Sequence, residues 1–71
     1  MWMIAKNGSV VNMSMMECLC INRMDNRQVV AISPSGKTYI MAERAAPEDA
    51  VRFLKKAAVA MNRIMENRNG T

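Results

Sequence analysis

The segment 45–50, Ala-Ala-Pro-Glu-Asp-Ala, separates two different patterns in this chain. Before it, short runs of alternating apolar and polar residues are interrupted by turn sequences; after it, apolar residues recur at helical spacing almost to the end. Pro47 suits the first position of a helix, where its missing N–H would have no helical partner, and Glu48 and Asp49 suit the positive end of the helix dipole. The chain is therefore predicted to be an α+β domain, with strands first and one helix last.

The strand half contains two turn signals. Asn7-Gly8 is the strongest short hairpin signal, because both residues tolerate positive φ, and the segment Ser33-Pro34-Ser35-Gly36 has proline and glycine where a type I turn prefers them. The strands expected around these turns are residues 2–6, 9–13, 17–23, 28–32 and 37–42. We expect them to form one antiparallel sheet of four to five short strands, a β-meander over residues 1–44.

The helix is predicted over residues 47–67, as an amphipathic helix packed on one face of the sheet, with residues 68–71 as a frayed tail. The whole chain, 1–71, then forms a single domain. Alternation in the last strand predicts that Met41 and Ala42 lie on opposite faces of the sheet.

The apolar face of the expected helix is wider than one sheet requires. Its apolar residues cover about 180° of the circumference, whereas packing on one sheet needs about 100°. They are Ala50, Val51, Phe53, Leu54, Ala57, Ala58, Ala60, Met61, Ile64 and Met65. The surplus flank is the expected interface, with Val51, Phe53, Ala58, Ala60 and Met65 as candidate interaction residues.

The size of the chain favours association. A core in a domain of 71 residues supplies only about 3–5 kcal/mol, and small domains usually need a disulfide, a metal or a partner chain in addition. The chain has two cysteines and no histidine, while nine methionines supply adaptable apolar surface. We therefore expect a homodimer, with an unidentified second protein as another partner and no cofactor.

Cys18 and Cys20 are expected on one face of the strand 17–23, with Cα atoms about 7 Å apart. That spacing is too long for a disulfide between them. Zinc needs four ligands, so the two thiols make only a weak metal candidate, as a Cys₄ site across a dimer axis. The favoured interpretation is two small, half-buried apolar residues in a reducing cytoplasm.

A basic ridge on the polar side of the helix offers a second function. Arg52, Lys56 and Arg63 fall within about 40° of one another, with Lys55 nearby. Such a ridge can contact phosphates without sequence preference, as in a nucleic-acid-binding regulator. Glu48, four residues before Arg52, and Glu66, three after Arg63, are expected local partners, so a solvated helix face is favoured.

Catalysis has little support in this composition. The segment 31–38, Ala-Ile-Ser-Pro-Ser-Gly-Lys-Thr, approximates a phosphate-binding loop, but its first glycine is missing and residues 39–41 continue as a strand instead of opening a helix. The chain also has no histidine for general-base work near neutral pH. We expect no enzyme activity and no catalytic residue.

The start of the chain predicts the location of the protein. Residues 1–6 lack the basic leader and the long apolar run of a signal peptide, and no stretch approaches the roughly 20 apolar residues that a membrane span needs. A cytoplasmic protein without membrane contact is expected.

The motifs of residues 1 to about 65 resemble a group of small bacterial and phage proteins. Those proteins have the pattern Met-Trp-Ile, a glycine, Val-Asn-Leu, a β-hairpin and a C-terminal helix that begins with Glu-Glu-Ala. The matching elements here are Met1-Trp2-Met3-Ile4, Gly8, Val11-Asn12-Met13, the later hairpin and Glu48-Asp49-Ala50. The group is functionally uncharacterised, so the resemblance implies no active site.

The same resemblance implies that Leu19 and Ile21 face the core and that Cys18 and Cys20 point outward, which favours cysteines at a subunit contact. Methionine replaces the Leu and Val of that group at several positions, which implies looser packing. The leading hypothesis is a small, non-enzymatic, homo-oligomeric protein-interaction module of bacterial or phage origin, and the alternative is a nucleic-acid-binding regulator.

Overall fold

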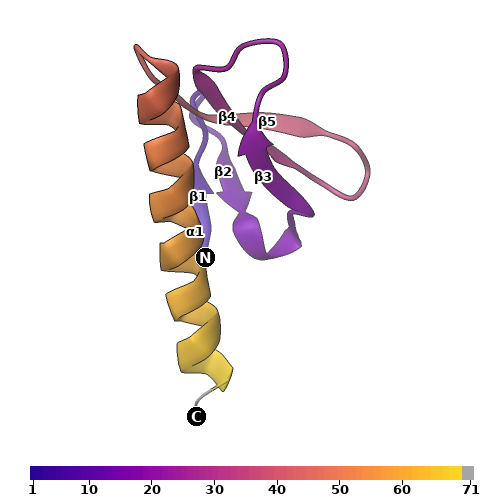
Figure 1. Cartoon of the computed structure of the whole chain (residues 1–71). Coiled ribbons are helices and arrows are strands. Elements are labelled where there is room, and N and C mark those ends of the chain that lie inside the picture. The colour runs from indigo at the N-terminus through magenta and orange to yellow at the C-terminus, as the bar shows by residue number, and fades with distance from the viewer. Residues whose placement is uncertain (70–71) are drawn as a thin grey trace.

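The computed structural model describes the backbone of residues 1–69 and the side chains of residues 1–62, and it is an α+β arrangement with antiparallel strands and one C-terminal helix (Figure 1). The elements are β1 (Trp2–Ile4), β2 (Val10–Asn12), the 3₁₀ turn η1 (Met13–Met15), β3 (Cys18–Ile21), β4 (Gln28–Ile32), β5 (Thr38–Glu43) and α1 (Pro47–Asn69). The predicted order of strands and helix is confirmed. The helix continues to Asn69, beyond the predicted end at residue 67, and the rest of the predicted tail, residues 70–71, lies outside the described residues.

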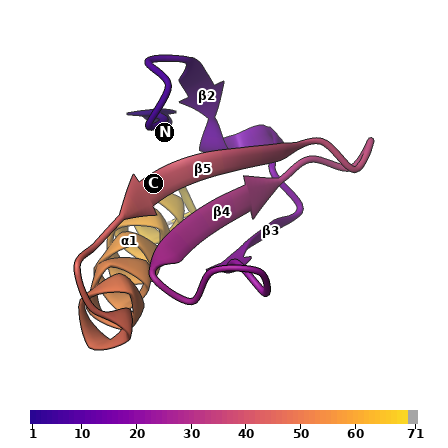
Figure 2. The ribbon, with the colours of Figure 1, turned by 90° about the horizontal axis from the view of Figure 1, so that it is seen from above.

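The strands form two sheets, and the prediction of one sheet of four to five strands is wrong. The first sheet is the hairpin β1-β2, and the second has the order β3-β4-β5. The chain leaves β2 through η1, where Asn12 Oδ1 accepts a hydrogen bond from Ser14 N at 3.1 Å. The hairpin lies next to β5 (Figure 2), joined to it by a hydrogen bond of 2.8 Å from Lys6 N to Ile40 O. It therefore covers the second sheet as a separate layer instead of extending it.

Both tight hairpins use the same turn. In each, the N–H of a glycine donates to the carbonyl three residues earlier, Gly8 to Ala5 and Gly36 to Ser33, both at 2.9 Å. Both glycines have φ near 90°, which is typical of a three-residue loop in which a type I turn is followed by a left-handed residue. Asn7 does not adopt positive φ, so the first hairpin has a loop one residue longer than a two-residue Asn-Gly turn.

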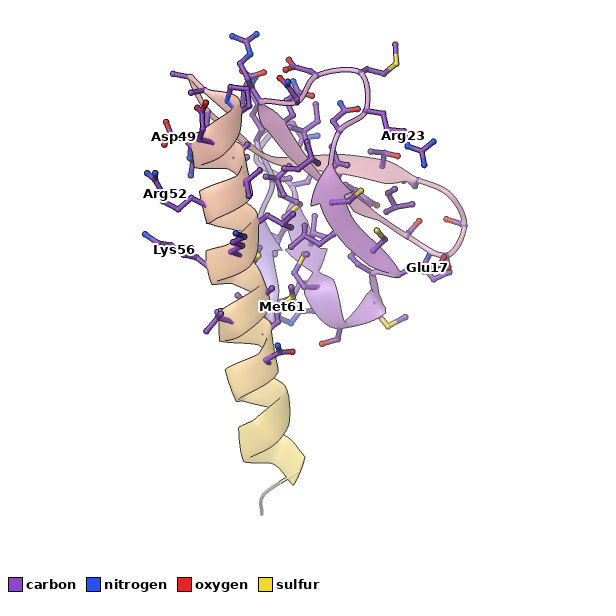
Figure 3. All side chains as sticks on the ribbon, viewed as in Figure 1. Glu17, Arg23, Asp49, Arg52, Lys56 and Met61 are labelled. Atoms are coloured by element: carbon purple, nitrogen blue, oxygen red, sulfur yellow. The ribbon has the colours of Figure 1, made fainter. Side chains whose placement is uncertain are left out.

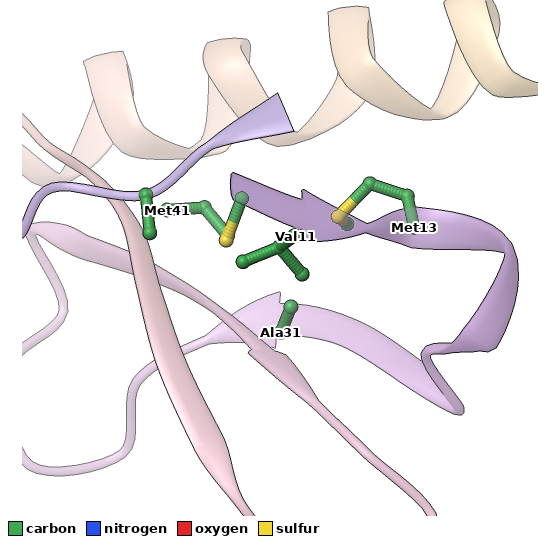
Figure 4. Packing of buried hydrophobic residues seen from close by; sticks show 5 residues of the cluster. Val11, Met13, Ala31 and Met41 are labelled. Carbon is green, nitrogen blue, oxygen red and sulfur yellow. The ribbon is translucent and has the colours of Figure 1, made fainter. Parts of the chain in front are cut away.

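The core is built mainly from small side chains. The buried residues are Ala5, Val11, Met13, Val29, Val30, Ala31, Met41, Ala42, Ala50 and Ala57. One cluster joins the inner face of the hairpin to β4 and β5 through Val11, Met13, Ala31 and Met41 (Figure 4). The other joins α1 to the sheet through Val29, Ala42 and Ala50. Among the residues with described side chains, no Leu, Ile or aromatic residue is fully buried.

A β-bulge allows two neighbouring residues to enter this core. The register shifts between Val29 and Val30, so that Ala42 pairs with Val29 while Ile40 pairs with Val30. Met41 is the extra residue, and it is buried together with Ala42. The prediction that Met41 and Ala42 lie on opposite faces is therefore wrong, because a bulge cancels the alternation locally.

The helix packs on the sheet through a narrow stripe. Ala50 and Ala57 are buried, and Leu54 and Met61 are half-buried on the same side. Alanine lets the helix axis approach the strands closely, so a stripe of this width suffices. The C-terminal turns of α1 extend past the strands (Figure 1).

Candidate interaction surfaces

Three exposed apolar side chains lie together on the outer face of the hairpin. Trp2, Ile4 and Val10 are 65%, 69% and 63% exposed. Ile4 pairs directly with Val10 across the two strands, and Trp2 lies two residues from Ile4 on the same face. Their neighbours Met3 and Val11 pack into the core instead. We did not predict this surface from the sequence, although the alternation of residues 2–5 was its signal.

A second apolar surface is the open face of the sheet β3-β4-β5. The hairpin and α1 both pack on the face that carries Leu19, Ala31 and Val29. The opposite face contains a shallow hollow of about 470 Å³, whose lining includes Cys18, Cys20, Val30, Ile32 and Thr38. The sheet therefore has one face covered by the hairpin and α1 and one apolar face on which no described helix or strand packs, although Val30 at its centre is buried.

The two cysteines lie on this open face. Leu19 and Ile21 pack against the core clusters, as the resemblance implied, whereas Cys18 is exposed and Cys20 is half-buried. Both are free thiols. Burial raises the pKa of Cys20 above its ordinary value of 9.0, and the neighbouring Cys18 thiol raises it further. Cys20 is therefore mainly protonated near neutral pH.

The proposed metal role of these thiols stays a prediction. Within the described part of the chain no three side chains of His, Cys, Asp or Glu come together in a way that could hold a metal ion. A site built from Cys18 and Cys20 would need ligands from a second chain.

Strand β3 has one free edge. Cys18 and Cys20 pair with Ile32 and Val30 of β4, and Asn22 N donates to Gln28 O at 2.9 Å in the same register. Alternate residues of an antiparallel strand point their backbone groups to the same side. Leu19 and Ile21 therefore direct their N–H and C=O groups away from β4, where the described residues provide no backbone partner.

Two residues of opposite charge flank this edge. Glu17 precedes β3 and Arg23 follows it by two residues, and both are exposed. Figure 3 shows them at the two ends of β3. Among the described residues neither forms a salt bridge. Within the described part of the chain, the edge thus has a central unpaired backbone and one unpaired charge of each sign near its ends, and the Arg23 side chain also lines the hollow beside Cys20.

The predicted helix interface is split by the buried stripe. Val51 is 39% exposed and Ala58 is also exposed, on one flank. Phe53 and Ala60 are half-buried on the other flank, where the Arg44 guanidinium lies 4.9 Å from the centre of the Phe53 ring. The side chain of Met65 lies outside the described residues. The two flanks face apart, so these residues do not form one continuous patch.

The basic ridge of the helix is only partly neutralised. Arg52 Nη1 lies 3.1 Å from Asp49 Oδ1. The prediction that Glu48 pairs with Arg52 is therefore wrong, and the ion pair joins residues three apart instead of four. Lys55 and Lys56 are exposed and, within the described residues, have no carboxylate at salt-bridge distance. The side chain of Arg63, with its expected partner, lies outside the described residues.

The phosphate-loop pattern forms a hairpin turn, as its context predicted. Ser33 N donates to Lys37 O at 2.9 Å, and the chain continues into β5 without a helix. The Lys37 ammonium lies 5.2 Å from the centre of the Tyr39 ring. Backbone N–H groups of a helix N-terminus, which hold phosphates in true phosphate loops, are missing from this segment.

Comparison of the chain with protein families, with curated proteins and with solved structures finds no match. The resemblance to small bacterial and phage proteins therefore stays a prediction. No helix in the described part of the chain combines the length and the apolar character that crossing a membrane requires.

Proposed function

We propose that the protein is a small, non-enzymatic interaction module that assembles with a second copy of itself. The observation that carries this proposal is the free edge and open face of the sheet β3-β4-β5. Among the described residues no element covers the face that carries Cys18, Cys20 and Ile32, and no backbone partner meets the outward groups of Leu19 and Ile21. An apolar face beside an unpaired strand edge is typical of a surface that a partner covers.

The exposed area supports the same proposal. The chain exposes 5093 Å², whereas a compact monomer of its mass exposes about 4,450 Å². Part of this difference comes from the turns of α1 that extend past the strands. The area left for an interface is therefore below roughly 600 Å², which is less than the roughly 800 Å² that each partner buries in a standard interface. An interface of this small size suits one additional copy.

Sedimentation equilibrium in reducing buffer tests the proposal. Over concentrations from about 1 to 200 μM, which bracket dissociation constants typical of small homodimers, the apparent mass should approach twice the chain mass of 8.0 kDa. A constant mass of 8.0 kDa over the whole range would refute self-association.

A second candidate function is nonspecific nucleic-acid binding through α1, and Lys55 and Lys56, which have no carboxylate partner among the described residues, favour it. Replacing both lysines by glutamate should abolish binding, and binding by the unmodified protein should weaken steeply with salt. A control is Lys37→Glu on the β4-β5 turn, which changes half as much charge away from the helix; Lys55→Glu and Lys56→Glu as single variants match it in charge. Absence of binding to mixed DNA and RNA at 50 mM salt removes this candidate.

A further inference from the structure

We infer that two copies pair through the free edges of β3, as antiparallel strands about a two-fold axis at Cys20. This inference rests on the proposed self-association and specifies its geometry. The second sheet has three strands, so the pairing would make one continuous sheet of twice that number. The partner is a second copy of this chain, because one edge then satisfies the other.

The backbone of β3 supports this pairing. Leu19 and Ile21 carry the outward N–H and C=O groups. With the axis at Cys20, Leu19 lies opposite the partner's Ile21, and Ile21 opposite the partner's Leu19. Both positions become hydrogen-bonded pairs, so the groups that β4 leaves free are all used. Cys20 then lies opposite the partner's Cys20, in a non-hydrogen-bonded pair with Cα atoms about 4.5 Å apart.

The flanking charges select this register. Glu17 and Arg23 are each three residues from Cys20 and lie just outside the regular strand Cys18–Ile21, so the axis at Cys20 brings Glu17 of each copy toward the partner's Arg23 at both ends of the interface. Moving the axis by one residue keeps the hydrogen-bond pattern but places Glu17 opposite the partner's Ile21, or Arg23 opposite the partner's Leu19. Either shift separates both pairs of opposite charges. Because opposite charges across neighbouring strands stabilise their pairing, the axis at Cys20 is favoured.

The composition of β3 gives no protection against such pairing. Natural edge strands that avoid association carry lysine, proline or inward-pointing charges. Here the strand is Cys-Leu-Cys-Ile, and the charges at its ends have opposite signs. The two-fold axis is perpendicular to the sheet, so both helices stay on one side, and the faces carrying the cysteines meet on the other.

Cysteine cross-linking tests the register. Diamide, a diazene oxidant, takes two electrons and two protons from two thiols and leaves one disulfide. A Cα separation of about 4.5 Å fits a disulfide, so the variant Cys18→Ser should give a covalent dimer that dithiothreitol reverses. The matched variant Cys20→Ser should cross-link at least about 10-fold more slowly. Because Cys18 is the more exposed thiol, random collision predicts the opposite order, and equal or reversed rates would overturn the register.

A charge exchange gives an independent test that involves no cysteine. Glu17→Arg and Arg23→Glu each create two like-charge contacts across the axis and should raise the dissociation constant about 10-fold. The double variant restores opposite pairs and should return to within about 3-fold of the unmodified protein. Both residues are exposed, and circular dichroism confirms that each variant folds.

The two tests separate this inference from the proposed function. An unmodified protein that stays monomeric in sedimentation fails the proposed function. A protein that dimerises, but whose double variant is no better than either single one, keeps its function and fails the β3 register.

Discussion

Val29→Ala is expected to cost a large part of the stability of this domain. Val29 is the largest of the fully buried side chains. It lies where β4 packs against Ala42 of β5 and Ala50 of α1. Removing two methyl carbons loses about 1.6 kcal/mol of transfer free energy, and the cavity left behind adds about 1 kcal/mol. The expected loss of about 2.5 kcal/mol is at least half of the roughly 3–5 kcal/mol that a core of this size supplies.

The matched control is Val10→Ala, which removes the same atoms from a residue that is 63% exposed. Urea denaturation followed by circular dichroism, at one fixed protein concentration, should show a loss below about 0.5 kcal/mol for this control. The concentration is fixed because assembly contributes to apparent stability. Equal losses for the two variants would refute the assignment of Val29 to a tightly packed core.

Two further predictions concern charge and the position of the hairpin. Hydrogen bonds from Lys6 and Gln28 hold the pKa of Glu43 below its ordinary value of 4.5. The stabilisation from ionised Glu43 is therefore present above pH 4.5 and is lost as the pH falls through the lower pKa of the folded state. The urea midpoint of the unmodified protein should exceed that of Glu43→Gln at pH 7, and the two midpoints should converge in acid. Trp2, the single tryptophan, lies on the hairpin next to β5 and away from the β3 edge. Its fluorescence maximum should therefore not shift when the protein dimerises. A blue shift on dimerisation would indicate that the hairpin face is the interface.

The local elements were predictable because each depends on nearby residues. Pro47 and the two acids after it fix the start of the helix, and the positive φ of Gly8 and Gly36 follows from the turn sequences. The division into two sheets was not predictable from alternation. Alternation states which residues share a face, but not whether β2 continues into the next strand or turns away at Asn12, where a side-chain hydrogen bond starts the 3₁₀ turn.

The helix shows a similar limit. Its sequence predicts which residues are apolar, but the width of the buried stripe depends on how closely the helix approaches the strands. With Ala50 and Ala57 at the contact, the approach is close and the stripe is narrow. The predicted interface residues therefore separate into two flanks, and Val51 and Ala58 stay exposed on one of them. Distance between elements, which sets this width, is a tertiary property.

The free edge of β3 is the clearest case in which structure gives meaning to a spacing already present in the sequence. Glu17 and Arg23 lie symmetrically about Cys20, but in the centre of a sheet that symmetry would have no consequence, because both neighbours of the strand would be fixed. Once β3 is an outer strand, a second molecule can approach its free backbone. Two antiparallel copies of one strand are related by a two-fold axis, so residues equally far from the axis on either side lie opposite each other. The axis position that brings Glu17 toward the partner's Arg23 also places Cys20 opposite the partner's Cys20.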